Sequence, residues 1–454
     1  MSFELLDSTV DMVLSYKPSL NQKEHHFYTT DSSVRTVKFI DLFAGLGGTR
    51  IGFEQACNES QIKSECVFTS EIKEHAIAVY KSNFTGSDIS GDITKIDPNN
   101  IPNFDYMLAG FPCQPFSSAG KRNGFLDERG GLFFVILKIL KEKTPEGFLL
   151  ENVDGLVTNG NGETLKVILT ELEQIGYKVS WKVLDSSDFG VPQKRNRVYI
   201  VGTKSFKPTL DNFTFSYKNT GEFIDNNAPV VATPFTKLLL KNFSVDELRG
   251  KSIKDKRGGD NNIHSWDLEV KGSVTKEQKK LLELILKKRR YKKWAESKGI
   301  DWMDGMPLTY DEINTFYDHP KLQQNLNDLT TKGYLKLEHP KKRVTIKGIS
   351  KRVPHTDAPK GYNIVAGKLS FPLAVIIDPS DVSPTIVATE AGKIGVATKK
   401  GIRSITVHEG LRFSGFPESY KMIGVDYFKA FDLIGNTVMP PVIKAVSLKM
   451  LSER

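Results

Sequence analysis

Short apolar runs alternate with longer stretches of helical spacing between residues 36 and 203. The apolar runs predict strands at about 37–43, 66–70, 106–109, 147–150, 178–184 and 197–202. The stretches between them predict helices at about 48–56, 74–84, 132–143 and 164–175. Strands that alternate with helices of about ten to fifteen residues are typical of α/β proteins. We therefore predict a doubly wound, mostly parallel sheet.

The alternation stops beyond residue 203, which predicts a second, smaller domain. Residues 205 to about 400 are rich in Lys, Asn and aromatic residues, and their strongest helix candidate is the basic stretch 281–298. The amphipathic stretch 440–451 is too short to fold alone, so we expect it to pack on the first domain. The expected parts are an N-terminal extension with a peripheral helix (1–35), the α/β domain (36–204), the second domain (205–427) and a returning C-terminal segment (428–454).

Composition and charge favour a globular protein and disfavour several other classes. The chain has 454 residues, of which 39% are hydrophobic and 26% charged, as in globular proteins with a sizeable core. No apolar run approaches the roughly 18 residues that cross a bilayer, and the first residues lack the basic start of a secretory signal. We therefore expect a cytoplasmic protein. The three cysteines, Cys57, Cys66 and Cys113, are too scattered for a disulfide framework or a zinc site, and the net charge of +9 mildly favours a polyanionic partner.

Four candidate segments directly follow expected strands. Ligands of parallel α/β sheets bind beyond the carboxyl ends of the strands, where the turn 43–48, Glu71, Cys113 and Glu151 all fall. Glycines let the backbone approach a ligand closely, and Glu71 is placed to bind ribose hydroxyls, so a nucleotide-type cofactor is indicated. The glycine spacing does not match G-x-G-x-x-G, and a tight turn without a ligand explains this motif equally well when it is taken alone.

Cys113 lies between two prolines in the stretch 110–117, Gly-Phe-Pro-Cys-Gln-Pro-Phe-Ser. A lone cysteine is more often a small buried hydrophobe than a nucleophile. The stiff loop at the end of a strand favours the nucleophile, because it directs the residue toward the ligand edge. A reactive thiolate also needs a positive neighbourhood, for which Lys194, Arg195 and Arg197 are candidates.

The pair Glu151-Asn152 follows the next strand, and Arg195 and Arg197 alternate into the last one. A carboxyl group there is suited to acid catalysis, and the asparagine to fixing a loop. Alternate arginines lie on one face of a strand, where they suit anionic or carbonyl oxygens. Taken alone, the first pair is more simply a turn or a helix N-cap, and the arginines fit a solvated edge strand.

In this order, the segments resemble the cytosine-C5 DNA methyltransferase family of the prokaryotic modification type. Residues 41–48 are similar to its cofactor motif and 110–117 to its catalytic loop, and 151–153 and 193–197 match the next two signatures. Residues 403–412 with 415–417 resemble the motif that closes the variable region, and 435–438 the final cofactor-side motif. The resemblance covers about residues 36–203 and 385–452, and residues 205 to about 385 carry no motif of the family.

The resemblance implies an S-adenosylmethionine-dependent methyltransferase fold with a second domain that recognises DNA. It implies methyl transfer to C5 of a cytosine flipped out of duplex DNA, through a covalent bond between Cys113 and C6. Thiolate addition at C6 makes an enamine whose C5 can attack a methyl group, while a protonated Glu151 relieves the charge at N3. We expect the loop 117–131 to close over the base. The expected catalytic residues are Cys113, Glu151, Arg195 and Arg197, and those of the substrate loop are Pro112, Gln114, Ser117 and Asn152.

The implied methyl donor is S-adenosyl-L-methionine, and the product is S-adenosyl-L-homocysteine. Phe43 is expected to stack on adenine, Glu71 to bind the ribose, and Asp92 with Ile93 to contact the base. No metal is expected, because none of the eight histidines has ligand spacing. The expected cofactor-binding residues are Phe43, Ala44, Gly45, Leu46, Gly47, Gly48, Glu71, Ile72, Asp92, Ile93, Gly110, Leu132, Asn436 and Thr437.

The expected partners are double-stranded DNA and, for a modification enzyme, a cognate restriction endonuclease that acts on the same site. We expect a monomer associated with the nucleoid through DNA and no membrane partner. One alternative is the same chemistry on structured RNA, since a related branch of the family modifies tRNA. Another is a DNA-binding regulator that has kept the fold without catalysis, against which the intact Cys113, Glu151 and Arg197 argue.

Overall fold

The computed structural model divides the chain into two compact units. The first unit comprises Met1–Pro229, Ile377–Gly392 and Ile405–Arg454, and the second comprises Val230–Ile376 and Lys393–Ser404. The residues that the structure describes are 35–112, 131–255, 261–301, 305–346, 349–365, 371–388 and 391–452. The peripheral helix expected near the start of the N-terminal extension lies outside these described ranges.

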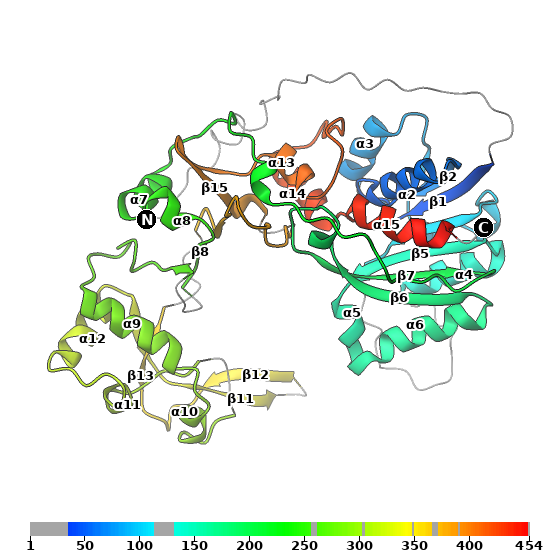
Figure 1. The fold of residues 1–454 in the computed structure, drawn as a ribbon. Coiled ribbons are helices and arrows are strands. Elements are labelled where there is room, and N and C mark those ends of the chain that lie inside the picture. The colour runs from blue at the N-terminus through cyan, green and yellow to red at the C-terminus, as the bar shows by residue number, and fades with distance from the viewer. Residues whose placement is uncertain are drawn as a thin grey trace. The chain divides into compact units, whose positions relative to one another are not determined.

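A seven-stranded sheet forms the centre of the first unit, in the order β3-β2-β1-β4-β5-β7-β6 (Figure 1). The pairs among β3, β2, β1, β4 and β5 are parallel, whereas β7 runs antiparallel to both β5 and β6. The predicted α/β fold with a mostly parallel sheet is therefore confirmed. The strands are β1 (Thr36–Leu42), β2 (Lys63–Ser70), β3 (Ile89–Ser90), β4 (Tyr106–Gly110), β5 (Gly147–Val153), β6 (Lys178–Asp185) and β7 (Asn196–Thr203).

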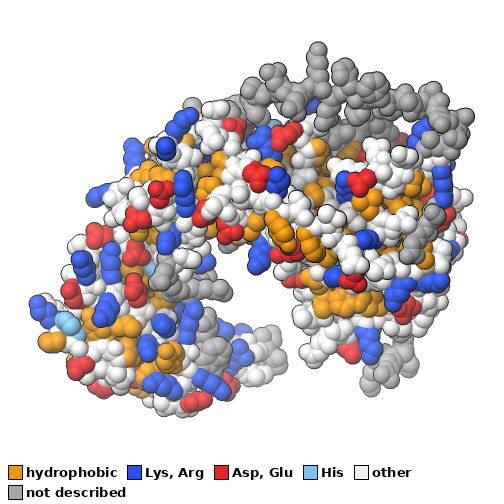
Figure 2. Space-filling model, viewed as in Figure 1, with side chains coloured by type: hydrophobic (Ala, Val, Ile, Leu, Met, Phe, Trp, Pro, Cys, Tyr) orange, Lys and Arg blue, Asp and Glu red, His pale blue; other side chains and the backbone are white. Residues whose placement is uncertain are grey.

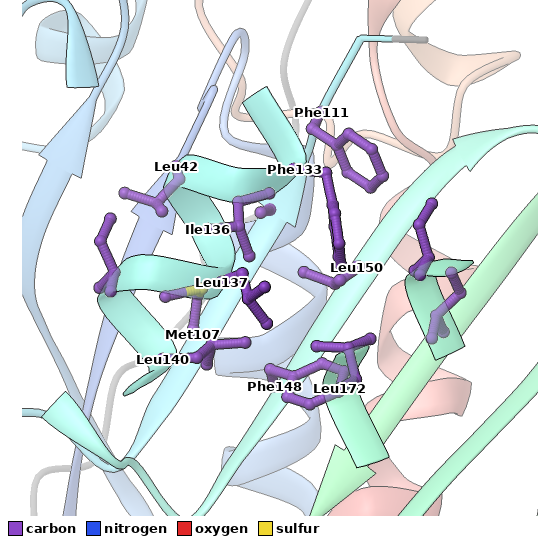
Figure 3. Packing of buried hydrophobic residues seen from close by; sticks show 14 of the residues in the cluster. Leu42, Met107, Phe111, Phe133, Ile136, Leu137, Leu140, Phe148, Leu150 and Leu172 are labelled. Atoms are coloured by element: carbon purple, nitrogen blue, oxygen red, sulfur yellow. The ribbon is translucent and has the colours of Figure 1, made fainter. Parts of the chain in front are cut away.

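Helices cover both faces of this sheet. Alternate residues of its central strands point to opposite faces, so each face has an apolar surface on which helices can pack. In β4, Met107 packs with helices α4 and α6 in one apolar cluster, and Leu108 packs with α2 and α15 in the other. Figure 3 shows Phe133, Ile136, Leu137 and Leu140 of α4 packed over the first face. The helices of this unit are α2 (Gly48–Glu59), α3 (Glu74–Asn83), α4 (Leu132–Lys143), α5 (Gly155–Thr158), α6 (Glu163–Gln174), α13 (Val407–Arg412), α14 (Tyr427–Asn436) and α15 (Pro440–Leu451).

The C-terminal helix α15 lies beside α2 (Figure 1), and the two pack closely. A side chain on Gly52 of α2 would come within 2.5 Å of the Pro440 carbonyl oxygen and 2.6 Å of Ile443 Cβ. Val442, Ile443 and Val446 of α15 are fully buried in the same cluster as Phe53 of α2. The end of the chain is therefore an integral layer of the first unit.

The unit boundaries differ from those of the predicted domains. Residues 205–229, 377–392 and 405–427, which the sequence placed in the second domain, belong to the first unit. Side-chain and backbone bonds hold them there: the Asp225 amide donates to Glu409 (2.9 Å), and the Tyr420 hydroxyl donates to the Leu46 carbonyl (2.6 Å). Such contacts join residues far apart in the chain, so local patterning does not reveal them.

The second unit combines short helices with three small sheets. Its five-stranded sheet has the order β16-β15-β14-β8-β9, and β10 pairs with β13 and β11 with β12. Its helices are α7 (Pro234–Asn242), α8 (Val245–Leu248), α9 (Lys276–Lys288), α10 (Lys293–Glu296), α11 (Tyr310–Asn314) and α12 (Leu322–Thr331). Its strands are β8 (Ser252–Ile253), β9 (Asn262–Ile263), β10 (Leu335–Glu338), β11 (Lys341–Ile346), β12 (Ile349–Pro354), β13 (Gly361–Ile364), β14 (Val375–Ile376), β15 (Ile394–Thr398) and β16 (Gly401–Ser404).

The predicted basic helix at 281–298 has other boundaries in the structure. Helix α9 begins five residues earlier, after a capping box in which Thr275 pairs with Gln278. It ends at Lys288, whose carbonyl oxygen accepts a hydrogen bond from Trp294 Nε1 (2.8 Å). The chain then turns, because Trp294 is buried in the apolar cluster of the unit.

Candidate active site

The turn between β1 and α2 forms one wall of a cavity at the carboxyl ends of the parallel strands. Phe43, Gly45 and Gly47 have φ angles of 56°, 53° and 73°. Residues other than glycine rarely adopt positive φ, so the backbone at Phe43 is strained. A side chain on Gly48 would come within 2.3 Å of the Val438 carbonyl oxygen, so only glycine fits where the turn meets the C-terminal segment.

Glu71, directly after β2, ties its own strand end to this turn. Its Oε2 accepts a hydrogen bond from the Gly45 amide (2.8 Å), and its Oε1 accepts from the amides of Ile72 (2.8 Å) and Lys73 (2.9 Å). The carboxylate is 9% exposed, at the cavity wall. Because each carboxylate oxygen can accept about two hydrogen bonds, Oε2 keeps capacity for a ligand hydroxyl.

Asp41 lies below the turn as a fully buried carboxyl group. The hydroxyls of Thr49 (2.6 Å) and Tyr80 (3.3 Å) donate to its two oxygens. Burial raises the pKa of Asp41 to about 7, against the lowering effect of the Thr49 bond and of nearby Arg50. This group fixes the start of α2 from inside the protein, and the sequence indicated it only as part of the cofactor motif.

Glu151 and Arg197 form an ion pair across the antiparallel strands β5 and β7. Arg197 Nε lies 3.1 Å from Glu151 Oε1, and their side chains are 15% and 9% exposed. Burial raises the pKa of Glu151 above its usual value, and the charges of Arg197 and Arg195 oppose that rise. The carboxyl group is thus more easily protonated than an exposed glutamate, while a guanidinium stays beside it.

Asn152 fixes the backbone where the expected substrate loop begins. Its Nδ2 donates to the Phe111 carbonyl oxygen (2.8 Å), and its Oδ1 accepts from the Val153 amide (2.8 Å). Pro112 follows at the cavity wall. The predicted residues Cys113, Gln114 and Ser117, with the expected closing loop 117–130, lie outside the described residues.

Arg195 is nearly fully buried and binds backbone carbonyl groups. Its Nη1 donates to Ile386 (3.1 Å), and its Nη2 donates to Gly435 (3.0 Å) and Thr437 (3.1 Å). Burial and the charge of Arg197 lower its pKa to about 10, so it remains charged at neutral pH. These bonds support a positioning role for Arg195, which anchors the segment that carries Asn436 and Thr437. Its predicted catalytic role remains a prediction.

Asp92 caps the short helix η1 (Ile93–Lys95) at another side of the cavity. Its Oδ1 accepts from the Thr94 amide (3.0 Å) and hydroxyl (2.7 Å), and these bonds lower the pKa of Asp92. Ile93 beside it is buried, whereas Ile72 is 69% exposed although it also lines the cavity.

The cavity has a volume of about 360 Å³ and gathers most of the predicted site. Among the described predicted residues, only Gly47 does not line it; a side chain on Gly47 would come within 2.5 Å of the Phe84 ring and 3.0 Å of the Tyr80 ring. The predicted lining residues are Phe43, Ala44, Gly45, Leu46, Gly48, Glu71, Ile72, Asp92, Ile93, Gly110, Pro112, Leu132, Glu151, Asn152, Arg195, Arg197, Asn436 and Thr437.

The sequence missed eight residues of the cavity wall. They are Ser70, Lys73, Ala76, Phe111, Val153, Leu433, Gly435 and Val438. Phe111, Val153, Gly435 and Val438 lie within motifs that the sequence analysis identified but were not among the expected site residues, and Ser70 and Lys73 lie within two residues of Glu71. Leu433 and Ala76 lie on helices α14 and α3, where only the tertiary fold brings them to the cavity.

The described part of the chain contains neither a metal-binding cluster nor a membrane-spanning helix. Within it, no group of three or more His, Cys, Asp or Glu side chains is arranged to hold a metal ion. The helices of that same part include none with the length and apolar character needed to span a bilayer.

A doubly wound sheet with a glycine turn and an acidic residue at the end of the next strand is typical of α/β enzymes that bind a nucleotide-type cofactor. The family model described as C-5 cytosine-specific DNA methylase matches residues 37–452. The chain therefore belongs to the C-5 cytosine-specific DNA methylase family. C5 methyltransferases generally use S-adenosyl-L-methionine as methyl donor.

Three relatives match nearly the whole chain. The Type II methyltransferase M.NlaIV of Neisseria lactamica is 52% identical over 92% of this chain and 99% of its own length. The Type II methyltransferase M.NgoBV of Neisseria gonorrhoeae is 51% identical over the same shares. M.HgiCI of Herpetosiphon aurantiacus, also a Type II methyltransferase, is 40% identical over 92% of this chain and 98% of its own.

Proposed function

We propose that this DNA methyltransferase is the modification enzyme of a Type II restriction–modification system. It transfers a methyl group from S-adenosyl-L-methionine to C5 of a cytosine in duplex DNA. The observation that carries the proposal is the family match over residues 37–452, together with relatives named Type II methyltransferases at 52% and 51% identity. A cognate restriction endonuclease is the partner that this role implies.

The cavity suits a methyl donor built from a nucleoside and an amino acid. Ile72, exposed to 69%, is an apolar side chain that a purine would cover, and Phe43 and Ile93 add apolar wall. Glu71 Oε2 accepts one hydrogen bond from Gly45 and has capacity for a ribose hydroxyl. We infer that these residues hold the donor, which supplies an electrophilic methyl group when it is bound.

The Cys113 thiolate is proposed to attack C6 of the cytosine, which makes C5 nucleophilic. The sulfur forms a bond to C6, and C5 accepts the methyl group. Loss of the C5 proton and expulsion of the thiolate then restore the aromatic ring. Asn152 supports this step by holding the Phe111 carbonyl, two residues before Cys113.

Glu151 is proposed to donate a proton or hydrogen bond to N3 as the thiolate adds. Its raised pKa favours the protonated form that this role requires. Arg197, 3.1 Å from the carboxyl group, is positioned to hold the carbonyl oxygen of the same base. Since stacking hides both faces of the C5–C6 bond in a duplex, the nucleotide must be flipped into the cavity.

Transfer of labelled methyl groups to duplex DNA and to tRNA tests the proposal. We expect label in DNA alone, and bisulfite sequencing of DNA from expressing cells to map it to one cytosine of a short site. That DNA should also resist the endonuclease that cuts the site. Label in tRNA, or none in DNA, would contradict the proposed function.

A further inference from the structure

Strands β11 and β12 form a basic hairpin in the second unit. They pair only with each other, as an antiparallel two-stranded sheet (Figure 1). Residues 341–354 contain six Lys or Arg residues and no Asp or Glu. No family motif explains this charge, because the hairpin lies in the part of the chain where the sequence shows none.

One face of the hairpin carries five exposed side chains that have hydrogen-bond donors. The side chains of Lys341, Arg343, Thr345, Ser350 and Arg352 are exposed and share this face, as the pairing register requires. On the other face, Lys342, Val344 and Val353 are half-buried, and Lys351 is exposed. The hairpin therefore packs with one side and presents cations and hydroxyls on the other.

Arg343 and Arg352 are direct cross-strand partners on the exposed face. Like charges in this position destabilise an antiparallel pair. Within the described residues neither guanidinium forms an ion pair with an acidic side chain, whereas Lys342 on the other face lies 3.9 Å from Asp357. The arrangement is unfavourable in the free protein, and a bound polyanion would offset it.

Basic residues elsewhere in the unit are differently arranged. Helix α9 buries Leu281, Leu282, Ile285 and Leu286, and it carries Glu277 and Glu283 besides its lysines. Figure 2 shows Lys and Arg mixed with Asp and Glu over most of the visible face. Residues 341–354, by contrast, combine six Lys or Arg residues with no acidic residue of their own.

We propose that the exposed face of the β11–β12 hairpin binds in the major groove of the substrate DNA, an inference that rests on the proposed function. The groove is about 12 Å wide and admits a two-stranded β-ribbon. Arg343 and Arg352 bind acceptor atoms there, of which guanine O6 and N7 suit a guanidinium best. Thr345 and Ser350 add short donors near the hairpin tip. The hairpin is thus a determinant of which site is methylated.

The test compares the full-length Arg343→Ala/Arg352→Ala variant with the wild-type protein. Its matched control is Lys276→Ala/Lys280→Ala, which removes two exposed charges from α9 of the same unit. The probes are a duplex with the site mapped by bisulfite sequencing and a duplex of scrambled sequence. Dissociation constants are measured by fluorescence anisotropy over a range of salt concentrations, and melting temperatures and S-adenosyl-L-homocysteine binding report the fold.

We expect the arginine variant to bind the site duplex at least tenfold more weakly, with a smaller loss on the scrambled duplex. Its melting temperature should be unchanged or higher, because the like-charge pair is gone, and the control should bind as the wild type does. Wild-type affinity in the arginine variant, or an equal loss on both duplexes, would overturn the groove assignment. If the wild-type protein methylates no DNA at all, the proposed function itself fails, which is a separate outcome.

Discussion

The proposed reaction depends most directly on the protonation state of the Glu151 carboxyl group. Burial raises its pKa, while Arg197 at 3.1 Å keeps a positive charge beside it. Burial and the charge of Arg197 shift the pKa of this carboxyl group in opposite directions. They act together on the reaction, because a protonated acid and a nearby cation both stabilise negative charge that develops on the pyrimidine.

Replacing Glu151 with Gln should lower the methyl-transfer rate by about 10²- to 10⁴-fold. The amide keeps the shape and one donor but cannot deliver a proton. Single-turnover transfer to duplex DNA measures the rate, and calorimetry with S-adenosyl-L-homocysteine should show unchanged donor binding. The control Glu163→Gln, at an exposed site on α6, should react as the wild type does. A Glu151→Gln variant of wild-type rate would remove this residue from the chemistry.

Asp41 makes stability depend on pH in a predictable direction. Its pKa is about 7 in the folded protein and about 3.9 in an unfolded chain. The folded state therefore holds the proton more tightly, so the free energy of unfolding falls as pH rises from about 4 to about 7. The total effect is on the order of 4 kcal/mol.

The Asp41→Asn variant should lose this pH dependence. An asparagine can still accept from Thr49 and can donate to the Tyr80 oxygen, so its bonds are retained while the buried charge is removed. Urea unfolding at pH 5 and pH 8 measures the effect: the variant should gain stability relative to wild type at pH 8 and little at pH 5. Equal gains at both pH values would show that the carboxyl group is not the titrating group.

At the scale of elements, the contact between α2 and α15 supports two sides of the cavity at once. Helix α2 follows the glycine turn, and α15 follows the segment that contains Asn436 and Val438. Arg195 fixes the same segment through the carbonyl groups of Gly435 and Thr437. A change in this packing should therefore alter donor binding without touching the donor.

Gly52→Ala should destabilise the protein by about 1–3 kcal/mol, because the new methyl group overlaps Pro440 and Ile443. The matched control is Gly155→Ala in α5, where nothing lies within 4 Å of the added atom. The control should be neutral or slightly stabilising. Thermal unfolding of both variants measures the difference, and a Gly52→Ala variant as stable as the control would contradict the packing described here.

Elements with strong local patterns could be predicted well from the sequence. The expected helices 132–143 and 440–451 have the same bounds as α4 and α15. The end of α9 could not be predicted, because the hydrogen bond from Trp294 that closes it depends on how Trp294 is buried. The expected ends of the strands led to most of the cavity-lining residues, because the carboxyl ends of parallel strands lie together at one edge of the sheet.

At the scale of the whole molecule, the chain joins regions far apart in sequence into one catalytic unit. Residues 405–452 complete the cavity and the core of the unit that begins with β1. The amphipathic pattern of 440–451 predicted its packing on this unit, whereas the place of 435–438 at the cavity could be predicted only through their resemblance to a family motif. The boundaries of the second unit, and the face of it that we propose binds DNA, depend on packing that no local pattern records.

The most direct test of the account is covalent trapping on a duplex that carries 5-fluorocytosine at the mapped position. Fluorine at C5 blocks the last step, so the bond between Cys113 and C6 should persist in the presence of S-adenosyl-L-methionine. We predict a denaturant-stable protein–DNA adduct whose mass includes the oligonucleotide and one methyl group, attached at Cys113 and lost in Cys113→Ser. Methylation of ordinary cytosine without any such adduct, or an adduct that survives Cys113→Ser, would contradict the mechanism.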